Sequence, residues 1–600
     1  MAEYLSPGVY VEEFDSGSTP MEGVGTSTAG FVGLAQRGPT SGLPQLVTNF
    51  ADFGRIYGGR LSANEFGDYR FLAYAVESFF VNGGARCYVM RVAPSDAKAS
   101  TGSAASLAFT AKNPGIWGDD IVISFAPASK AKTQVLEIIN DPDGKKYRVK
   151  SSVGFNVGDV VAYAEGDKVT YNKVVKSQDN VITFEKDYPD SIVDTNLLPS
   201  KVITTCEFTV TVKYDDLVET YENVSFNIEA PNYIEKATAK SDLIIAAYNA
   251  SGEAPAAAPA AAPAADAKGD DKKDKKSAPA AAPAAGGITA PMDIIGVTSL
   301  NLKGGSNGSV ASVSAGDFIG EDKGAGKRTG IQAFVDNDVV SIIAAPGVTD
   351  PNVQLTLVSH CENLASRFAV LDIPQDAKKV EDVEAHRDIF DSEYAALYHP
   401  WLIVYDSLDK KNIAIPPSGA VMGIYARSDN TRGVHKAPAN EVVRNCVGLD
   451  CQFNKGEQDI LNPKGVNLIR SFPGQGIRVW GARTVSSNGL WKYVNVRRLF
   501  IYLEESIKAN TSWVVFEPND EALWVRVQRT ISVFLTTMWR EGSLMGSSPE
   551  EAFFVNIGRE TMSQDDIDNG RLICVIGIAP VKPAEFVIFR LTQKTSESAE

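Results

Sequence analysis

The chain has 600 residues, more than one hydrophobic core usually serves, so several domains are expected. Its 44% hydrophobic and 22% charged content is typical of a soluble globular protein. The net charge of −16 argues against a protein that coats nucleic acid, and no apolar run approaches the roughly 20 residues that span a bilayer. The start of the chain does not have the pattern of a secretory signal. We therefore expect no nucleic-acid partner and no direct membrane insertion.

The cysteines and histidines form no metal-binding pattern. Six cysteines are scattered along the chain and none belongs to a CxxC pair. Cys446 and Cys451 are weakly spaced for a metal, so we expect reduced, mostly buried thiols in a protein made in a bacterial cytoplasm. No HExxH pattern connects the four histidines, which are His360, His386, His399 and His435. We expect no metal site and no cofactor.

The N-terminal region begins with a strand-prone stretch, PGVYVEEFD at residues 7–15, before a Gly/Ser/Thr-rich segment. Such a strand is either a frayed terminus or an arm that pairs with another subunit. Beyond it, the pattern predicts a strand in TAGFVGLAQRGP and a helix over about Tyr69–Asn82 that ends at Gly83 and Gly84. The stretch ARCYVMRVA predicts the next strand.

The region from 107 to 251 is rich in strand patterns. The stretches NPGIWGDDIVISF and CEFTVTVKYDD alternate between apolar and polar residues. Between them, three short strands are separated by turns at 166–167 and 179–180. This pattern predicts a small barrel over about 128–200, inserted into a β-rich domain.

Residues 252–287 are of low complexity, with Ala/Pro repeats on both sides of DAKGDDKKDKK. The prolines favour an extended chain, and the mixed charges cannot form a core. Interleaved aspartates cancel most of the positive charge, which argues against a nucleic-acid patch. We expect a disordered, solvated surface loop.

After this stretch, apolar runs alternate with helical patterns. The apolar runs are Val339–Ala344, Phe368–Ile373 and Trp401–Tyr405, and the helical patterns are Asn352–Arg367 and about Ala377–Tyr394. Strands that alternate with helices in this way predict a mostly parallel sheet covered by helices.

The last hundred residues predict two helices followed by strands. An apolar stripe marks each helix: Val496, Leu499, Leu503 and Ile507 on the first, and Trp524, Val527, Ile531, Phe534, Leu535 and Met538 on the second. Asn519 is placed to cap the second helix, and Gly542 to end it. Period-two alternation around Cys574 and over 586–591 predicts an α+β module that ends on a strand.

Two stretches suggest catalysis, and neither fits. The sequence GAGKRT at 324–329 lacks the first Gly of a phosphate loop and the Ser or Thr that follows its Lys. His435, Ser418 and Asp406 could form a hydrolase triad, but no GxSxG elbow carries the serine. We expect no catalytic residue, and therefore no enzyme.

Several long stretches resemble the tail sheath proteins of contractile phage tails and phage-like contractile injection systems. They are SPGVYVEEF, GVHKAPANE, NVRRLFIYLEESI, FEPN, AFFVNIG and GRLICVIGIAPVKPAEFVIFRL, and they extend over roughly 1–125 and 288–592. The resemblance implies a structural subunit that polymerises helically around an inner tube and contracts to drive the tube through a target envelope. It also implies baseplate and tail terminator or cap proteins as partners, in a virion tail or an injection-system particle.

The residue patterns and the resemblance together predict a multidomain fold of the α+β and α/β classes, in six parts. These are a strand-donating arm (1–22), an α/β part of the sheath body (23–106), an inserted β-rich domain (107–251), the loop (252–287), a central α/β domain (288–480), and a C-terminal domain with its own arm (481–600). The arms would exchange strands between subunits through Val9, Tyr10, Val11, Phe14, Phe586, Ile588, Phe589 and Leu591.

Four arginines are candidates for the surface that faces the tube: Arg497, Arg498, Arg526 and Arg529. The first two lie in the first turn of a predicted helix, where the macrodipole favours acids, so they suggest an acidic partner. The alternative is that they pair with Glu504, Glu505 or other acids of their own chain.

Two alternative functions stay open: a non-contractile tail or tube component, and an α/β hydrolase-like enzyme. Two length states in micrographs would exclude the first, and activity of the monomer would support the second. The residues do not separate a phage tail from a bacterial injection system.

Overall fold

The computed structural model describes residues 21–104, 106–142, 144–165, 168–193, 202–248 and 299–591. The predicted N-terminal arm, with Val9, Tyr10, Val11 and Phe14, and the predicted loop at 252–287 lie outside these residues. The chain forms two compact units: one comprises 1–35, 41–92 and 315–600, and the other comprises 36–40 and 93–314.

The first unit is built on a nine-stranded sheet in the order β2-β3-β1-β17-β18-β19-β24-β25-β22. In chain order these strands are β1 Ala29–Leu34, β2 Gln45–Val47, β3 Cys87–Val92, β17 Ile342–Ala344, β18 Phe368–Asp372, β19 Ala395–His399, β22 Glu441–Val442, β24 Val466–Phe472 and β25 Gly476–Val479. Neighbouring strands from β3 to β24 run parallel, and the strands at both edges run antiparallel. Strands β1, β18 and β19 are buried along their whole length, as expected of a parallel sheet covered on both faces.

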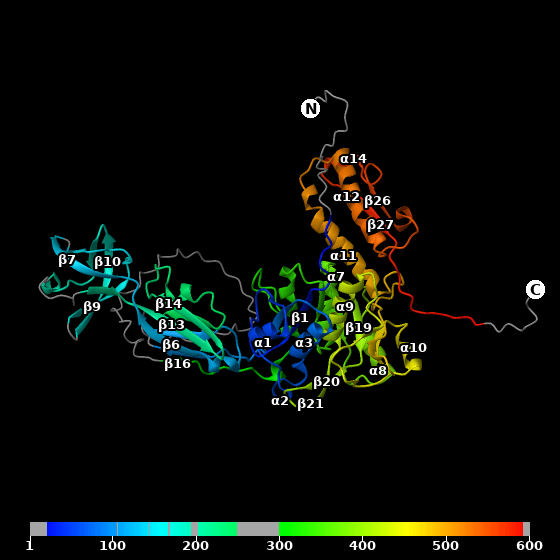
Figure 1. The fold of residues 1–600 in the computed structure, drawn as a ribbon, viewed down its shortest axis with the longest axis horizontal. Helices are drawn as coiled ribbons and strands as arrows, with labels where there is room; N and C mark the ends of the chain where they lie inside the picture. The colour runs from blue at the N-terminus through cyan, green and yellow to red at the C-terminus, as the bar shows by residue number, and fades with distance from the viewer. Residues whose placement is uncertain are drawn as a thin grey trace, which may run out of the picture. The chain divides into compact units, whose positions relative to one another are not determined.

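Helices cover this sheet (Figure 1). They are α1 Phe50–Tyr57, α2 Ala63–Phe66, α3 Leu72–Asn82, α6 Ala315–Ile319, α7 Pro351–Leu364, α8 Val380–Arg387, α9 Ser418–Arg432 and α10 Lys455–Leu461, with 3-10 turns η1 Gly67–Tyr69 and η5 Gly330–Asp336. Helices α3 and α9 pack closely because α9 presents glycines to α3. A Cβ at Gly419 would lie 2.3 Å from the carbonyl oxygen of Ala75, and one at Gly423 would lie 2.4 Å from that of Phe79.

One predicted strand of the central sheet is wrong. The stretch 401–405 corresponds to β20 Leu402–Asp406, which pairs antiparallel with β21 Lys411–Ile415 and β23 Gly448–Leu449 in a separate small sheet. The central strand is β19, directly after the region predicted as helix up to 394. The helix there, α8, ends earlier than predicted. Pro400 separates the two strands, because proline cannot donate a hydrogen bond to a strand ladder.

The second unit consists mainly of strands. Its sheets contain β4 Thr101–Ala104, β5 Leu107–Ala111, β6 Val122–Ala128, β13 Glu207–Tyr214, β14 Leu217–Val224, β15 Ile244–Tyr248 and β16 Ser299–Asn301, with α4 Ile234–Ala237 and the turns η2 Ile116–Asp120 and η4 Val310–Ser312. A closed barrel follows the order β10-β11-β8-β7-β12-β9. Its strands are β7 Lys132–Asp141, β8 Gly144–Val149, β9 Val160–Glu165, β10 Lys168–Gln178, β11 Val181–Phe184 and β12 Val202–Thr205, with η3 Asp190–Val193.

The barrel has more strands than the three that the sequence predicts, and its last strand, β12, lies beyond residue 200. Asp179 and Asn180 form the predicted turn, with φ angles of 52° and 59° that short polar side chains tolerate. The other predicted turn, at 166–167, lies outside the described residues. Aromatic side chains fill the barrel, among them Tyr147, Tyr163 and Phe184.

The C-terminal part of the first unit is an α+β module. It contains α11 Val494–Asn510, η6 Ser512–Val514, α12 Glu521–Arg540, α13 Pro549–Ala552, β26 Phe553–Ile557, α14 Gln564–Asp568 and β27 Cys574–Ile578. The two predicted apolar stripes are confirmed: all their members are buried except Ile507, which is partly buried against the core of the module. The predicted cap is wrong. Asp520 caps α12 by accepting a bond from Leu523 N, while Asn519 Oδ1 accepts one from Trp524 Nε1.

The strand predicted over 586–591 is not formed within this chain, and its pairing with a neighbouring subunit stays a prediction. The last described strand is β27, and residues 579–591 have no regular secondary structure. The strand-like pattern of 586–591 therefore has no partner strand among the residues that the structure describes.

Candidate functional site

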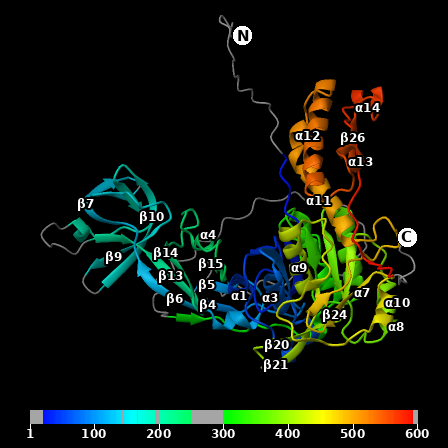
Figure 2. The same cartoon turned by 45° about the vertical axis from the view of Figure 1, so that its right-hand side comes forward.

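A two-stranded antiparallel sheet forms the outer layer of the C-terminal module (Figures 1 and 2). In it, Phe553 of β26 faces Ile578 of β27, and Ile557 faces Cys574. Neither strand pairs with any other strand in the described part of the chain. A sheet of two strands is marginally stable alone, and each open edge offers unpaired N–H and C=O groups to another strand.

An apolar groove of about 800 Å³ lies beside this sheet, between β27, α11, α12 and the loop that joins the helices. Cys574 and Ile576 contribute from the strand, and Val527 and Ile531 contribute from α12. Phe516 lies at the groove and is fully exposed, with a φ of 70° that is unfavourable for a bulky side chain. Exposed apolar surface of this kind marks an interaction site.

The C-terminal segment Phe586–Leu591 is the most exposed apolar stretch of the described chain. Its large side chains have exposed fractions of 72% for Phe586, 68% for Val587, 78% for Ile588, 84% for Phe589 and 95% for Leu591. Figure 1 shows it as a red trace that leaves the module. Apolar side chains in this number are not left in water without a partner, because burying each stabilises by about 1.5–3 kcal/mol.

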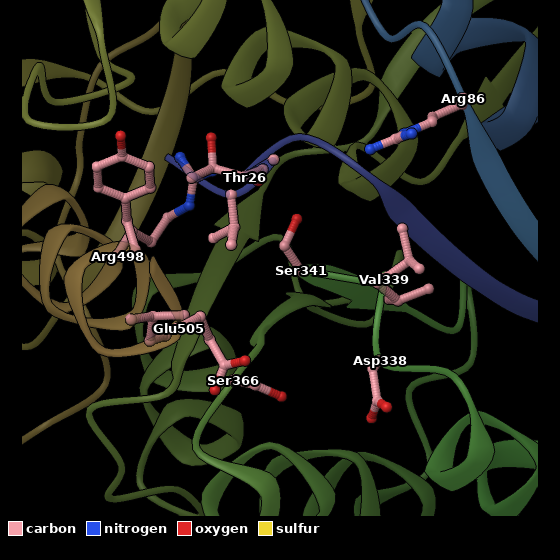
Figure 3. A pocket seen from close by; sticks show the side chains of 13 residues that line it. Thr26, Arg86, Asp338, Val339, Ser341, Ser366, Arg498 and Glu505 are labelled. Atoms are coloured by element: carbon pink, nitrogen blue, oxygen red, sulfur yellow. The ribbon is translucent and has the colours of Figure 1, made fainter. Parts of the chain in front are cut away.

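A second pocket, of about 280 Å³, lies at the amino ends of the central strands (Figure 3). Ligands of open α/β sheets bind at the opposite, carboxyl ends. Both arginines that line it are already engaged: Arg498 pairs with Asp429, and Arg86 Nε donates to Thr28 Oγ1 at 2.8 Å. We assign no ligand to this pocket.

The residues of the imagined hydrolase triad do not meet. Ser418 Oγ donates to Asp372 Oδ2 at 2.7 Å, whereas His435 Nδ1 lies 2.8 Å from Ser543 Oγ. Asp406 accepts bonds from backbone N–H groups of its own loop. In the glycine-rich stretch at 324–329, Arg328 pairs with Asp322 and Asp336.

Neither a cluster of metal ligands nor a membrane-spanning helix occurs among the described residues. They contain no group of three or more potential metal ligands. They also contain no helix with the length and apolarity to cross a membrane.

Comparison with known proteins decides the family. The family model for the phage tail sheath protein central domain matches residues 323–485, and that for the phage tail sheath C-terminal domain matches residues 486–594. This chain belongs to the tail sheath protein family. It is a sheath protein of a contractile tail or injection system. These matches favour neither the hydrolase nor the tube alternative.

Sheath proteins from several sources are similar to this one. A putative prophage major tail sheath protein of Pseudomonas aeruginosa (strain UCBPP-PA14) is 25% identical over 288 residues, which are 46% of this chain and 72% of that protein. The tail sheath protein of Escherichia phage P2 is 24% identical over 286 residues, 46% of this chain and 69% of that protein. In fold, the chain is similar to the PVC sheath complex of an extracellular contractile injection system in its contracted state, with a TM-score of 0.50, 21% identity and 99% coverage of both chains.

Two of the four arginines predicted to face the tube are buried inside the sheath protein, which corrects that prediction. Arg497 pairs with Glu393 and Glu504, each at 3.0 Å, and stacks on aromatic rings. Arg498 pairs with Asp429. The alternative, pairing within the chain, is the correct one, because both guanidinium groups are enclosed and paired with acids of their own chain.

Arg526 and Arg529 lie on the exposed face of α12. Arg526 packs 4.4 Å over the ring of Trp513 and pairs loosely with Glu517 at 3.4 Å. Arg529 makes no ion pair with any residue that the structure describes. Both side chains are free to meet a partner, so their role at the tube stays a prediction.

Sequence reasoning missed the polar residues that hold the segments next to the two predicted arms. Glu585, which precedes the exposed segment, binds Arg483. Arg498, Ser506 and Asn510 on α11 bind the chain that leads to the N-terminal arm. In the sequence these three residues are separated by multiples of four positions, and this spacing indicates that they share one face of a helix.

Proposed function

We propose that this sheath protein polymerises helically around an inner tube and contracts to drive the tube through a target envelope. The central step is strand exchange: the arms of each subunit add strands to the β26–β27 sheet of neighbouring subunits. Baseplate and terminator or cap proteins would complete the particle, which would assemble from subunits made in the bacterial cytoplasm. The chain is similar in fold to a solved sheath complex in a contracted state, and this similarity supports contraction.

The observation that carries the proposal is an unpaired apolar strand pattern on a molecule that also has unpaired strand edges. Phe586–Leu591 is exposed, and β26 and β27 each lack an outer partner in the described part of the chain. Strand addition satisfies both, because backbone bonds complete the ladder while alternate side chains fill an apolar face. The groove lined by Cys574 and Ile576 provides such a face.

Energetics favour links of this kind for a contracting polymer. Each backbone hydrogen bond of an added strand contributes roughly 0.5–1.5 kcal/mol, and the apolar side chains add to this. Arms that stay paired allow the bodies to move as rigid units between two packings. The free energy of contraction would be released as new interfaces form between bodies, so no active site is needed.

Removal of the N-terminal arm tests the proposal. Deleting residues 1–16 should leave a folded monomer with unchanged circular dichroism, because the arm contributes nothing to its own core. That monomer should form no sheath that survives contraction in electron micrographs. The substitution Val11→Pro should act similarly, since proline removes a ladder donor. Truncated subunits that assemble and contract without breaking would refute strand exchange.

A further inference from the structure

Both chain segments that lead to the predicted arms are fastened to α11 or to residues beside its start. On the N-terminal side, residues 22–26 run along a stripe of α11 formed by Arg498, Tyr502, Ser506 and Asn510. These residues recur every four positions and therefore share one face of the helix. Figure 3 shows Thr26 beside Arg498, with Glu505 of the same helix nearby.

Side chains of α11 hold the backbone of this segment. Asn510 accepts a bond from Glu22 N at 3.3 Å and donates one to Glu22 O at 2.8 Å, as a neighbouring strand would do. Ser506 Oγ accepts a bond from Val24 N at 3.1 Å. These contacts use main-chain groups of the segment, so they fix its path rather than any one of its side chains.

The close fit at Gly23 fixes the same path. A Cβ there would lie 1.9 Å from the hydroxyl of Tyr502, so any other residue at this position would require the Tyr502 side chain to move. One turn earlier on the helix, Arg498 Nη2 donates to Thr26 O at 3.0 Å, and Thr26 Oγ1 donates to Asp429 Oδ2 at 2.7 Å. The Arg498–Asp429 ion pair thus grips Thr26 through both its backbone and its side chain.

On the C-terminal side, Glu585 is seated at the beginning of α11. Arg483 donates to both of its carboxylate oxygens at 2.7 Å, and Asn462 Nδ2 donates to one of them at 2.7 Å. Tyr493, the residue that precedes α11, donates its hydroxyl to Glu585 at 2.9 Å. Burial raises the pKa of this carboxyl group, but these hydrogen bonds outweigh it and lower the pKa to about 2.

A second contact fixes the same segment closer to the module. Asn495, buried in the first turn of α11, donates to Val581 O at 3.1 Å. The residue after Glu585 is Phe586, where the exposed stretch begins. The chain is therefore held up to Glu585 and exposed from Phe586 onwards.

We infer that α11 and the residues beside its start, Arg483 and Tyr493, form the common anchor of both arms. The contacts that hold 22–26 (the clamp) and those that hold Glu585 (the seat) transmit the pull of neighbouring subunits into the body of the sheath protein. This inference rests on the proposed strand exchange, because without it the arms carry no load. Anchors at both roots confine bending to the arms themselves, so each body turns as a unit during contraction.

The test weakens each anchor and leaves the arm strands intact. Glu585→Ala removes the C-terminal seat, with exposed Glu560→Ala as its matched control. The double variant Ser506→Ala and Asn510→Ala opens the N-terminal clamp, with Lys508→Ala on the exposed side of α11 as its control. Circular dichroism and thermal melting of each monomer establish that it is folded.

Monomers give the first readout. Hydrogen exchange at the Glu22 and Val24 amides should accelerate about fivefold in the double variant, since each lost hydrogen bond contributes roughly 1 kcal/mol. Lys508→Ala should exchange like the wild type. Unchanged exchange of these amides in the double variant would show that Ser506 and Asn510 do not hold residues 22–26, regardless of how the sheath behaves.

Sheaths give the second readout. Variants with weakened anchors should assemble into extended sheaths, because their strands still pair, but these sheaths should fragment on contraction. If Glu585→Ala sheaths remain as intact on contraction as Glu560→Ala sheaths, the contacts of Glu585 carry no load and the inference fails. Should Glu585→Ala not fold, Glu585→Gln replaces it, with fragmentation again expected. Failure of strand exchange itself is separable, since arm-deleted subunits would then assemble and contract normally.

Discussion

Arg498 and Asp429 form an enclosed ion pair between α11 and α9: Arg498 Nη1 lies 3.0 Å from Asp429 Oδ1, and Nη2 lies 2.5 Å from Oδ2. The guanidinium also lies 4.7 Å from the centre of the Tyr425 ring. Two charges removed from water are tolerable only when each neutralises the other. The pair therefore ties α11 to a helix that packs on the central sheet.

Removing one partner of this pair should be costly. Asp429→Ala leaves the buried charge of Arg498 unpaired, and we expect a loss of about 3–5 kcal/mol in the free energy of unfolding. The double variant Asp429→Leu with Arg498→Met should recover most of this loss, because it leaves no buried charge. Urea unfolding of the monomer measures both. A single-variant loss below about 1 kcal/mol would show that the pair is not enclosed.

The apolar stripe of α12 gives a second prediction. Ile531→Ala should cost about 2–5 kcal/mol, because the fully buried side chain leaves a cavity in the core of the module. Val533→Ala, two positions along on the exposed face, should change the stability by less than about 0.5 kcal/mol. Melting of the two variants side by side provides the comparison. Equal losses would mean that α12 does not present this face to the core.

Reversing charge on the exposed face of α12 tests the predicted contact with the tube. The variant Arg526→Glu with Arg529→Glu should co-sediment with purified tube protein less well than the wild type, while contacts between sheath subunits persist. Arg559→Glu, an exposed arginine of the same module, is the control. Unchanged co-sedimentation would remove these two residues from the interface.

Glu585 predicts a stability that depends on pH. Its pKa is lowered from the ordinary 4.5 to about 2, so its contribution is complete above pH 4.5 and is lost as the pH falls from 4.5 towards 2. Burial raises the pKa of Asp372 to about 6, so its contribution to stability changes with pH in the opposite direction. Asp372 is present in both the wild type and Glu585→Gln, so its effect cancels in their comparison. The melting temperature of the wild type minus that of Glu585→Gln should therefore shrink on acidification. A difference that stays constant from pH 6 to pH 3 would contradict the seat.

The helices of the C-terminal module could be predicted because their pattern is local. An apolar residue every three or four positions, as at Val527 and Ile531, needs no knowledge of distant chain. Strand β19 was harder, since AALYH at 395–399 follows a charged helical stretch directly and is buried by elements far away in sequence. Alternation at 586–591 predicts a strand, but a pattern cannot say whose chain supplies the partner.

Buried polar residues could not be predicted, because their partners are distant in sequence. Arg497 and Arg498 look like surface residues at the start of a helix, and only the fold brings Glu393 and Asp429 to them. Glu585 likewise appears unremarkable beside Pro583 until Arg483 is placed against it. The polar stripe of α11 was visible as a spacing, but the segment that it holds lies more than 400 residues away.

The most direct measurement is a cryo-electron microscopy map of the assembled sheath that resolves the β26–β27 sheet. We predict added strands along its open edges, and that these can be traced to the arms of other subunits, with Phe586–Leu591 among them. Each arm should leave its own body at the Glu585 seat or the 22–26 clamp. A map in which both edges of the sheet stay free, or are covered by segments of the same chain, would contradict the account.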